Sequence, residues 1–298
     1  MSSRDWSLLL FLSLLWGGSF FFARVALIDL PPLTLVLARV VIAAVALGLY
    51  IRVTVRVITT SRTVVITCLG MGLLNNVIPF SLIFWGQTVL PAGLTAILNA
   101  TTPLFSVIVM HLMTRDERAT PNKVAGVLLG FTGVIILIAP SISGLGATPL
   151  WAMLVCLAGA VSYAFSGLYG RRFKALGLDP AVAAFGQITA SSLLMVPLVA
   201  LVDSPWTLAM PGMPAILATI ALAVVSTALA YVVFFTILES AGPTNLLLVT
   251  FLIPVSAIAL GWVLLGEQLA WYHFAGMLLI GAGLAAIDGR ITARLFTR

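Results

Sequence analysis

Long apolar runs, separated by short polar or proline- and glycine-rich segments, occupy almost the whole chain. A helix of roughly 20 apolar residues crosses a bilayer core about 30 Å thick, and the chain divides into ten runs of about that length. We expect transmembrane helices at approximately 7–28, 33–51, 63–85, 91–113, 122–140, 149–170, 180–202, 213–237, 242–265 and 270–288. Since a helix satisfies its own backbone hydrogen bonds in lipid, the pattern predicts an all-α membrane protein with ten transmembrane helices.

The composition argues against a water-soluble domain. Of the 298 residues, 61% are hydrophobic and 8% are charged, whereas soluble domains carry roughly a quarter charged residues. Cys68 and Cys156 lie inside apolar runs, so they do not predict a disulfide framework. The net charge of +6 does not indicate nucleic-acid binding, because the basic residues are spread over separate short loops. We therefore expect the lipid bilayer, and no nucleic acid, as a partner.

The distribution of Lys and Arg predicts the orientation in the membrane. Thirteen of the fifteen lie outside the expected helices or, for Lys123, at the first turn of one, namely Arg4, Arg52, Arg56, Arg62, Arg115, Arg118, Lys123, Arg171, Arg172, Lys174, Arg290, Arg294 and Arg298. With ten helices, all of these positions fall on one face, and the loops of the opposite face contain no basic residue. The positive-inside rule then makes both termini cytoplasmic.

The two halves of the chain repeat each other. Residues 115–135 align with 265–285 without a gap and share Glu117 with Glu267, Ala125 with Ala275, Gly126 with Gly276, Leu128 with Leu278, Leu129 with Leu279 and Gly133 with Gly283. Weaker matches place Ala92 and Gly93 on Ala241 and Gly242, and Pro32 and Arg39 on Pro180 and Gln187. Because each unit holds an odd number of helices, the second unit enters from the opposite side. The pattern predicts two inverted five-helix repeats, 1–145 and 146–298.

Short motifs in both halves carry a family resemblance. They are the opening Trp16-Gly17-Gly18-Ser19, Pro31-Pro32 followed by Arg39, and an acidic pattern that reads Gly266-Glu267 to Ala275-Gly276 in its second copy. On these motifs the whole chain resembles the EamA branch of the drug/metabolite transporter superfamily. The resemblance implies a ten-helix carrier of small metabolites in a bacterial cytoplasmic (inner) membrane, similar to YddG-type amino acid exporters. It leaves the solute open, because the branch is broad.

Polar and aromatic residues inside apolar helices are candidates for solute binding. Polar groups at membrane depth are costly, so they face either a water-filled path or a neighbouring helix. Trp16 and Tyr163 lie too deep for interfacial anchors, and Arg39 is the deeper of the two basic residues within helices. The candidate set is Trp16, Ser19, Arg39, Asn76, Trp85, Asn99, Thr102, Tyr163, Ser166, Tyr231 and Thr250. These residues either line a cavity near the midplane or only join helices, and the sequence leaves both readings open.

The carrier hypothesis has competitors in other functional classes. An intramembrane enzyme acting on lipid-linked substrates needs a nucleophile with a base or a metal-binding cluster, and the sequence contains no G-x-S-x-G motif or His-Cys cluster. A channel needs a charged ring or a carbonyl-rich filter sequence. His111 and His273 lack ligand-spaced partners, so we expect neither a metal nor a cofactor. We predict a carrier that exports apolar or aromatic amino acids, or other drugs or metabolites, by alternating access.

Two further expectations follow from residue placement. All nine acidic residues fall in loops or within about a turn of an expected helix end, so no buried carboxylate is placed to relay protons. This favours a facilitator or exchanger over a proton-driven pump. Glycines recur in the fifth and tenth helices, where small residues allow close approach. They predict a packing face between these helices or a homodimer interface.

Overall fold

The computed structural model describes residues 2–54, 56–58, 60–143 and 148–288, and its regular elements are all helical. The α-helices are α1 (Ser3–Ala26), α2 (Pro32–Val53), α3 (Arg62–Gly72), α4 (Ile78–Gln87), α5 (Ala92–Asn99), α6 (Thr102–Met113), α7 (Pro121–Ile142), α8 (Leu150–Ala175), α9 (Pro180–Val202), α10 (Met213–Ala223), α11 (Ala230–Leu246), α12 (Val249–Leu265) and α13 (Trp271–Asp288). Short irregular helices are the π-helical η1 (Leu73–Val77) and η3 (Val224–Leu229) and the 3-10 turn η2 (Pro205–Thr207).

These elements form the ten predicted spans, which we number in chain order. Seven spans are single helices: spans 1, 2, 5, 6, 7, 9 and 10 are α1, α2, α7, α8, α9, α12 and α13. Within the described residues, nine helical segments are long and apolar enough to cross a membrane, and Val249–Leu265 is a shorter apolar helix. Spans 3 and 8 each consist of two α-helices joined by a π-helical turn, η1 and η3. Span 4 is broken between α5 and α6. The all-α fold and the ten-helix count predicted from the hydrophobic pattern are confirmed.

Span 9 begins differently from the prediction. The structure merges its first residues with α11 across a kink at Gly242, and α12 begins only at Val249. Gly242 has a φ of +77°, which glycine adopts without the steric cost that a side chain adds. This residue therefore marks the turn between spans 8 and 9.

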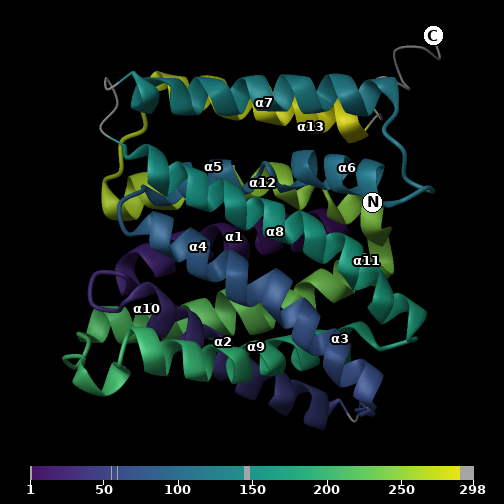
Figure 1. The fold of residues 1–298 in the computed structure, drawn as a ribbon, viewed down its shortest axis with the longest axis vertical. Coiled ribbons are helices and arrows are strands. Elements are labelled where there is room, and N and C mark those ends of the chain that lie inside the picture. Colours follow the sequence, from purple (N-terminus) through teal and green to yellow (C-terminus); the bar gives the residue numbers. More distant parts are fainter. Residues whose placement is uncertain (1, 55, 59, 144–147, 289–298) are drawn as a thin grey trace.

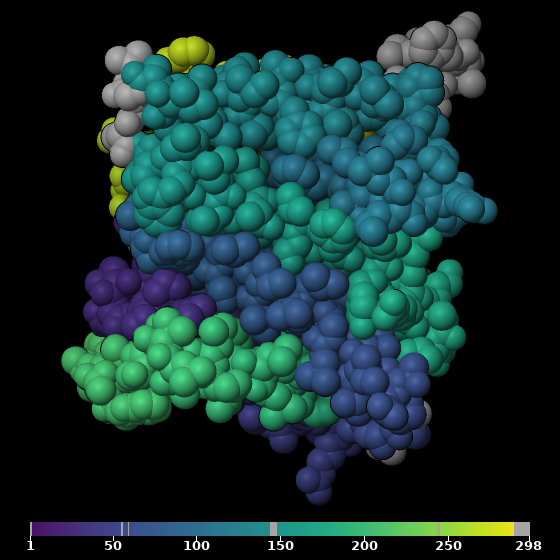
Figure 2. All heavy atoms as spheres, in the orientation of Figure 1, coloured from purple at the N-terminus to yellow at the C-terminus, as the bar shows by residue number. Residues whose placement is uncertain are grey.

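The two five-helix halves pack in matching ways. Span 1 (α1) contacts spans 8 and 9, and span 6 (α8) contacts the corresponding spans 3 and 4. The two largest remaining contacts each join a helix to its own repeat mate, α2 to α9 and α7 to α13. Figure 1 shows the α7 and α13 pair as a layer at one end of the molecule, and in Figure 2 the side chains of α7 cover that end. The boundary at 145 and 146 lies outside the described residues.

Glycines allow the close approach of α7 and α13. A Cβ added at Gly283 would lie 2.5 Å from the carbonyl oxygen of Gly126, and one at Gly133 would lie 2.6 Å from that of Gly276. Real Cβ atoms do not reach such distances, so only glycine fits this antiparallel contact. The predicted packing face between the fifth and tenth helices thus lies inside one chain. The homodimer stays a prediction.

Loop contacts divide the described loops between two faces. On the face of the basic loops, the contacts are Arg56 with Asp179, Arg171 with Asp116 and Glu117, and Ser240 with Asp5. On the other face, they are Arg24 with the carbonyls of Gln87 and Thr88, Thr34 with Asp203, Gly212 with Asp29, and Ala92 with Glu267. Every pair joins loops or helix ends that ten alternating crossings place on the same side.

We predict that Gly283→Val destabilises the fold, because a branched side chain would collide with the backbone of α7. The cost of such overpacking is about 1–3 kcal/mol, and thermal unfolding in detergent would show it as a lower Tm. Gly281→Val is the matched control, since a Cβ at Gly281 meets nothing within 4 Å. An equal Tm for both variants would contradict the tight α7 and α13 contact.

The positive-inside orientation predicts opposite labelling of two loops. Cysteines at Ser143 and Arg56, in a background without Cys68 and Cys156, should react with an impermeant thiol reagent from opposite sides of the membrane. Ser143 ends α7 on the face without basic residues, and Arg56 lies between α2 and α3 on the basic face. Labelling of both cysteines from the same side would refute the inverted arrangement of the repeats.

Candidate functional site

A cavity of about 1020 Å³ lies between the two halves. Its lining comes from spans 1–4 and 6–9, whereas the described residues of α7 and α13 contribute none. The cavity is larger than a small metabolite needs, and it combines apolar walls with a few polar groups, as ligand sites usually do. The interface between the repeats is therefore the candidate site.

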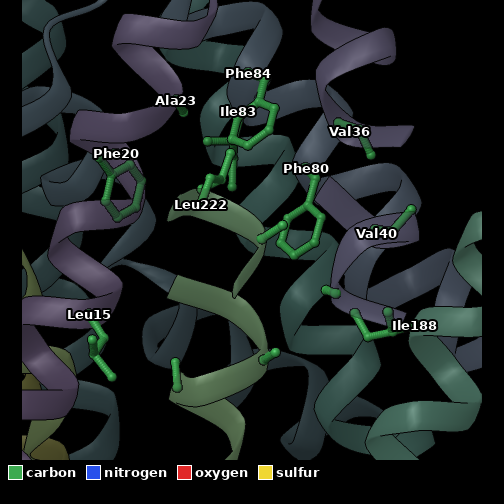
Figure 3. Close-up of a cluster of buried hydrophobic side chains, with 14 of the residues drawn as sticks. Leu15, Phe20, Ala23, Val36, Val40, Phe80, Ile83, Phe84, Ile188 and Leu222 are labelled. Carbon is green, nitrogen blue, oxygen red and sulfur yellow. The ribbon is translucent and has the colours of Figure 1, made fainter. Parts of the chain in front are cut away.

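The cavity opens toward the face that carries the basic loops. At this end it is lined by Phe173, Lys174, Leu178 and Pro180, around the connection from α8 to α9, and Lys174 and Pro180 are exposed. The opposite end is closed by a seal of buried apolar residues, which includes Phe20, Ala23, Ile83, Phe84 and Leu222. Figure 3 shows Ile83, Phe84 and Leu222 together in this seal, with Phe80 close by.

The structure brings most of the sequence-predicted residues to this cavity. Nine of the eleven candidates line it, namely Trp16, Ser19, Arg39, Asn99, Thr102, Tyr163, Ser166, Tyr231 and Thr250. They come from both halves, so the repeat interface collects polar and aromatic residues that are far apart in the sequence. Asn76 and Trp85 do not line the cavity.

Asn76 faces a neighbouring helix. It is fully buried, and its Nδ2 donates a hydrogen bond of 2.9 Å to Ser191 Oγ on α9. Its neighbour Asn75 lines the cavity in its place. Consecutive helical residues point roughly 100° apart, and here Asn75 points to the cavity while Asn76 points to α9. The candidate set named from the sequence contained Asn76, whereas the cavity lining contains its neighbour Asn75.

Trp85 lies at the molecular surface near the end of span 3. Its side chain is 51% exposed, and its ring centroid lies 5.4 Å from that of Trp151. Trp151 is in the first turn of α8. The pair therefore has the placement of an interfacial aromatic belt, where an indole ring sits partly in lipid and partly in the headgroup region.

Arg39 is the central charged group of the site. It is only 6% exposed, its Nε donates a 3.0 Å hydrogen bond to Thr227 Oγ1, and its guanidinium lies 3.8 Å from the centroid of the Phe80 ring. Among the described residues, no carboxylate lies within ion-pair distance of it. A buried charge without a counter-ion is costly. An anion that enters the cavity would offset this cost.

A polar network surrounds this cation. The Tyr231 hydroxyl accepts hydrogen bonds from Gln187 Nε2 at 3.1 Å and from Asn75 Nδ2 at 3.4 Å, and Ser166 Oγ donates to Asn75 Oδ1 at 2.9 Å. The side-chain amide oxygens of Asn99 (Oδ1) and Gln187 (Oε1) are buried without a hydrogen-bond partner. Both residues also contribute to the cavity lining, which therefore combines side-chain amides with a cation. Sequence reasoning missed Gln187 as a site residue, although its match to Arg39 in the repeat was the available signal.

Aromatic rings form much of the remaining wall. Trp16 and Phe234 have ring centroids 5.6 Å apart, and Tyr231 stacks against Phe235 at 6.0 Å. Tyr163 lines the same cavity from α8. Such walls suit an apolar or aromatic body. The described lining residues include no Asp, Glu or His, and the described residues contain no group of three potential metal ligands.

Comparisons with known proteins agree with this architecture. The chain is 27% identical over 294 residues to the "Probable amino-acid metabolite efflux pump" of Escherichia coli (strain K12), which covers 95% of this chain and 94% of that protein. It is 28% identical over 294 residues, with the same coverage, to the protein of that name in Salmonella typhimurium. The "Uncharacterized transporter YoaV" of Bacillus subtilis is 23% identical, covering 91% and 92% of the two chains.

The fold also matches a solved structure. One crystal structure superposes on this chain with a TM-score of 0.67 at 22% identity and covers 100% of both chains. At this identity the match supports the fold alone. The sequence profile of the EamA-like transporter family matches residues 6–139 and again residues 150–287, once for each half. The chain therefore belongs to the EamA-like transporter family.

Proposed function

We propose that this transporter exports amino acids with apolar or aromatic side chains, or closely related carboxylate metabolites. The observation that carries the proposal is Arg39, a buried cation without a carboxylate partner in a cavity walled by aromatic rings. The names of the Escherichia coli and Salmonella relatives support the same class of solute.

The solute carboxylate would bind at Arg39. A guanidinium presents five N–H donors in a planar fork that matches a carboxylate. Arg39 uses its Nε for Thr227, and its ring contact with Phe80 fixes the plane of the guanidinium. The two terminal nitrogens are then left to face the solute. Charge-assisted bonds of this kind are among the stronger ones in proteins.

The rest of an amino acid would meet the remaining lining. An ammonium group needs acceptors, and the side-chain amides of Asn99 and Gln187, which are in the lining and have unpartnered oxygens, would supply them by turning toward the solute. An apolar or aromatic side chain would lie against Trp16, Tyr163 and Tyr231. A phosphate ester is a poorer fit, because it would call for several basic residues, whereas the described lining contains only Arg39 and Lys174.

Alternating access would move the solute across the membrane. The cavity opens on the face of the basic loops, so under the positive-inside rule this conformation receives solute from the cytoplasm. Two inverted repeats support an equivalent opening on the other side, by rocking of one bundle against the other around a fixed site. We place the protein in the bacterial cytoplasmic membrane with both termini inside.

We expect Arg39→Gln to lower the transport of phenylalanine or leucine into proteoliposomes by about tenfold or more, because a hydrogen bond to a charged group contributes about 1.5–3 kcal/mol. Asn99→Ala and Tyr163→Ala should also slow transport, by smaller factors. The measurement is the initial rate of uptake of labelled solute at equal protein density.

Leu128→Ala provides the control, since Leu128 is 65% exposed on α7, away from the cavity. Its rate should match that of the unmodified protein. If Arg39→Gln transports amino acids as fast as Leu128→Ala does, the carboxylate site is in the wrong place.

The absence of acidic and histidine residues among the described lining residues also predicts how transport is driven. Proton-driven carriers commonly use such a group near the midplane as a relay. We expect a facilitator or exchanger, so solute should equilibrate but not accumulate when only a pH gradient is imposed on proteoliposomes. Accumulation above equilibrium under that gradient would show proton coupling.

A further inference from the structure

Glu267 caps a helix from another part of the chain, at the closed end of the cavity. It lies in the connection between α12 and α13, and its Oε1 accepts a 2.8 Å hydrogen bond from the backbone N–H of Ala92. Its Oε2 accepts a longer one, of 3.4 Å, from Gly93. These are the first residues of α5, whose N-cap position, Pro91, provides no side-chain cap. A carboxylate here satisfies orphan N–H groups and complements the helix dipole.

Arg24 makes the complementary contact on the neighbouring helix end. From the last turn of α1, its Nη1 donates to the carbonyl oxygens of Gln87 and Thr88, at 3.0 and 2.8 Å. These carbonyls lie at the C-terminal end of α4, where a cation is favourable. Arg24 and Glu267 therefore cap both sides of the helical hairpin formed by α4 and α5, next to the apolar seal.

The other half of the chain contains the same two charges. Trp16, Ser19 and Arg24 fall on Tyr163, Ser166 and Arg171 without a gap, and Glu267 falls on Glu117. The hairpin between α4 and α5 corresponds to the turn at Gly242, where the chain passes from span 8 to span 9. The open end of the cavity therefore contains the residues for an equivalent cap, namely Arg171 and Glu117, and the equivalent turn, at Gly242.

At this open end the charges have different partners. Arg171 forms ion pairs with Asp116, at 2.9 Å, and with Glu117. The Glu117 side chain is 48% exposed, so the pair is a surface contact. Exposed ion pairs contribute about 0–1 kcal/mol, so Arg171 and Glu117 lose little free energy when they change partners.

We infer that the two repeats use these charges as alternating latches, with Arg24 and Glu267 on one gate and Arg171 and Glu117 on the other. In the present structure the first pair caps its hairpin and holds its gate shut. When the cavity opens to the other side, Arg24 and Glu267 release that hairpin, while Arg171 and Glu117 separate and cap the turn at Gly242. All four are positioning residues, since none of them lines the cavity.

The exchange explains how the two conformations can have similar free energies. In each state one hairpin is capped and the other is free, so capping bonds lost at one gate are replaced at the other. A carrier needs this balance, because a large energy gap would trap it with one gate open. The inference rests on the alternating access proposed above but is independent of which solute is carried.

Labelling of a buried cysteine tests the latches without any solute. Ala23 is fully buried in the seal (Figure 3), so Ala23→Cys, without Cys68 and Cys156, reports opening of that gate to an impermeant maleimide. Glu267→Gln should speed its labelling by about five- to tenfold, the effect of weakening one capping contact of about 1 kcal/mol. Glu117→Gln should slow it, because the opposite conformation loses its latch, and the double variant should fall between the two.

Asp29→Asn is the matched control, because Asp29 accepts from the backbone N–H of Gly212 on the same face without touching the α4 and α5 hairpin. It should leave the labelling rate unchanged. Arg24→Gln is a second test of the same gate and should speed labelling as Glu267→Gln does. Equal labelling rates in the Glu267, Arg24 and Asp29 variants, or faster labelling in Glu117→Gln, would overturn the latch exchange. Normal gating in protein that transports no amino acid would instead count against the proposed solute.

Discussion

In lipid, every backbone N–H and C=O must find its partner within the protein, and this constraint shapes the whole molecule. It explains why the chain consists of helices long enough to cross a membrane. It also restricts where helices can be interrupted. The π-helical turns η1 and η3 and the break between α5 and α6 occur in spans 3, 8 and 4, all of which line the cavity. π-helical turns are common at functional sites, and here they occupy equivalent places in the two repeats.

Hydrogen-bond partners are equally scarce for side chains inside the membrane, and this makes the polar residues of the cavity informative. Many buried hydroxyl and amide groups of this protein bond to another helix or to a carbonyl one turn away, as the Asn76 amide nitrogen does to Ser191 and the Thr95 hydroxyl to Pro91. Arg39, Asn99 and Gln187 keep unused donors or acceptors where they line the cavity. Hydrogen-bond donors and acceptors that lack partners in a desolvated site lower the stability of the folded protein. The buried guanidinium of Arg39 and the aromatic walls around it are the physical basis for treating this cavity as the solute site.

The two inverted repeats share one architecture, but their sequences are not identical. Arg39 on α2 matches the neutral Gln187 on α9, and the charged and amide groups both line the site. The two sides of the lining therefore differ in charge: the first repeat contributes the cation, and the second contributes a neutral amide. A zwitterion has the complementary asymmetry. In the proposed mechanism the symmetric latches and the asymmetric lining are compatible, because none of the four latch residues lines the cavity.

Periodicity and charge placement alone determined much of this protein. The length of the apolar runs predicts the ten helices, because bilayer thickness fixes the number of residues per span, and the matching halves predict the repeats. Nine of eleven candidate residues line the cavity for a similar reason, since polar or aromatic groups at membrane depth need a protein or water partner.

Tertiary structure decided what depends on helix rotation and packing. It turns Asn75 toward the cavity and Asn76 toward Ser191, and it places Trp85 at the surface. It also leaves Arg39 without a carboxylate. Sequence position gives depth along a helix, but which way a side chain points depends on the neighbouring helices, and those come from distant parts of the chain.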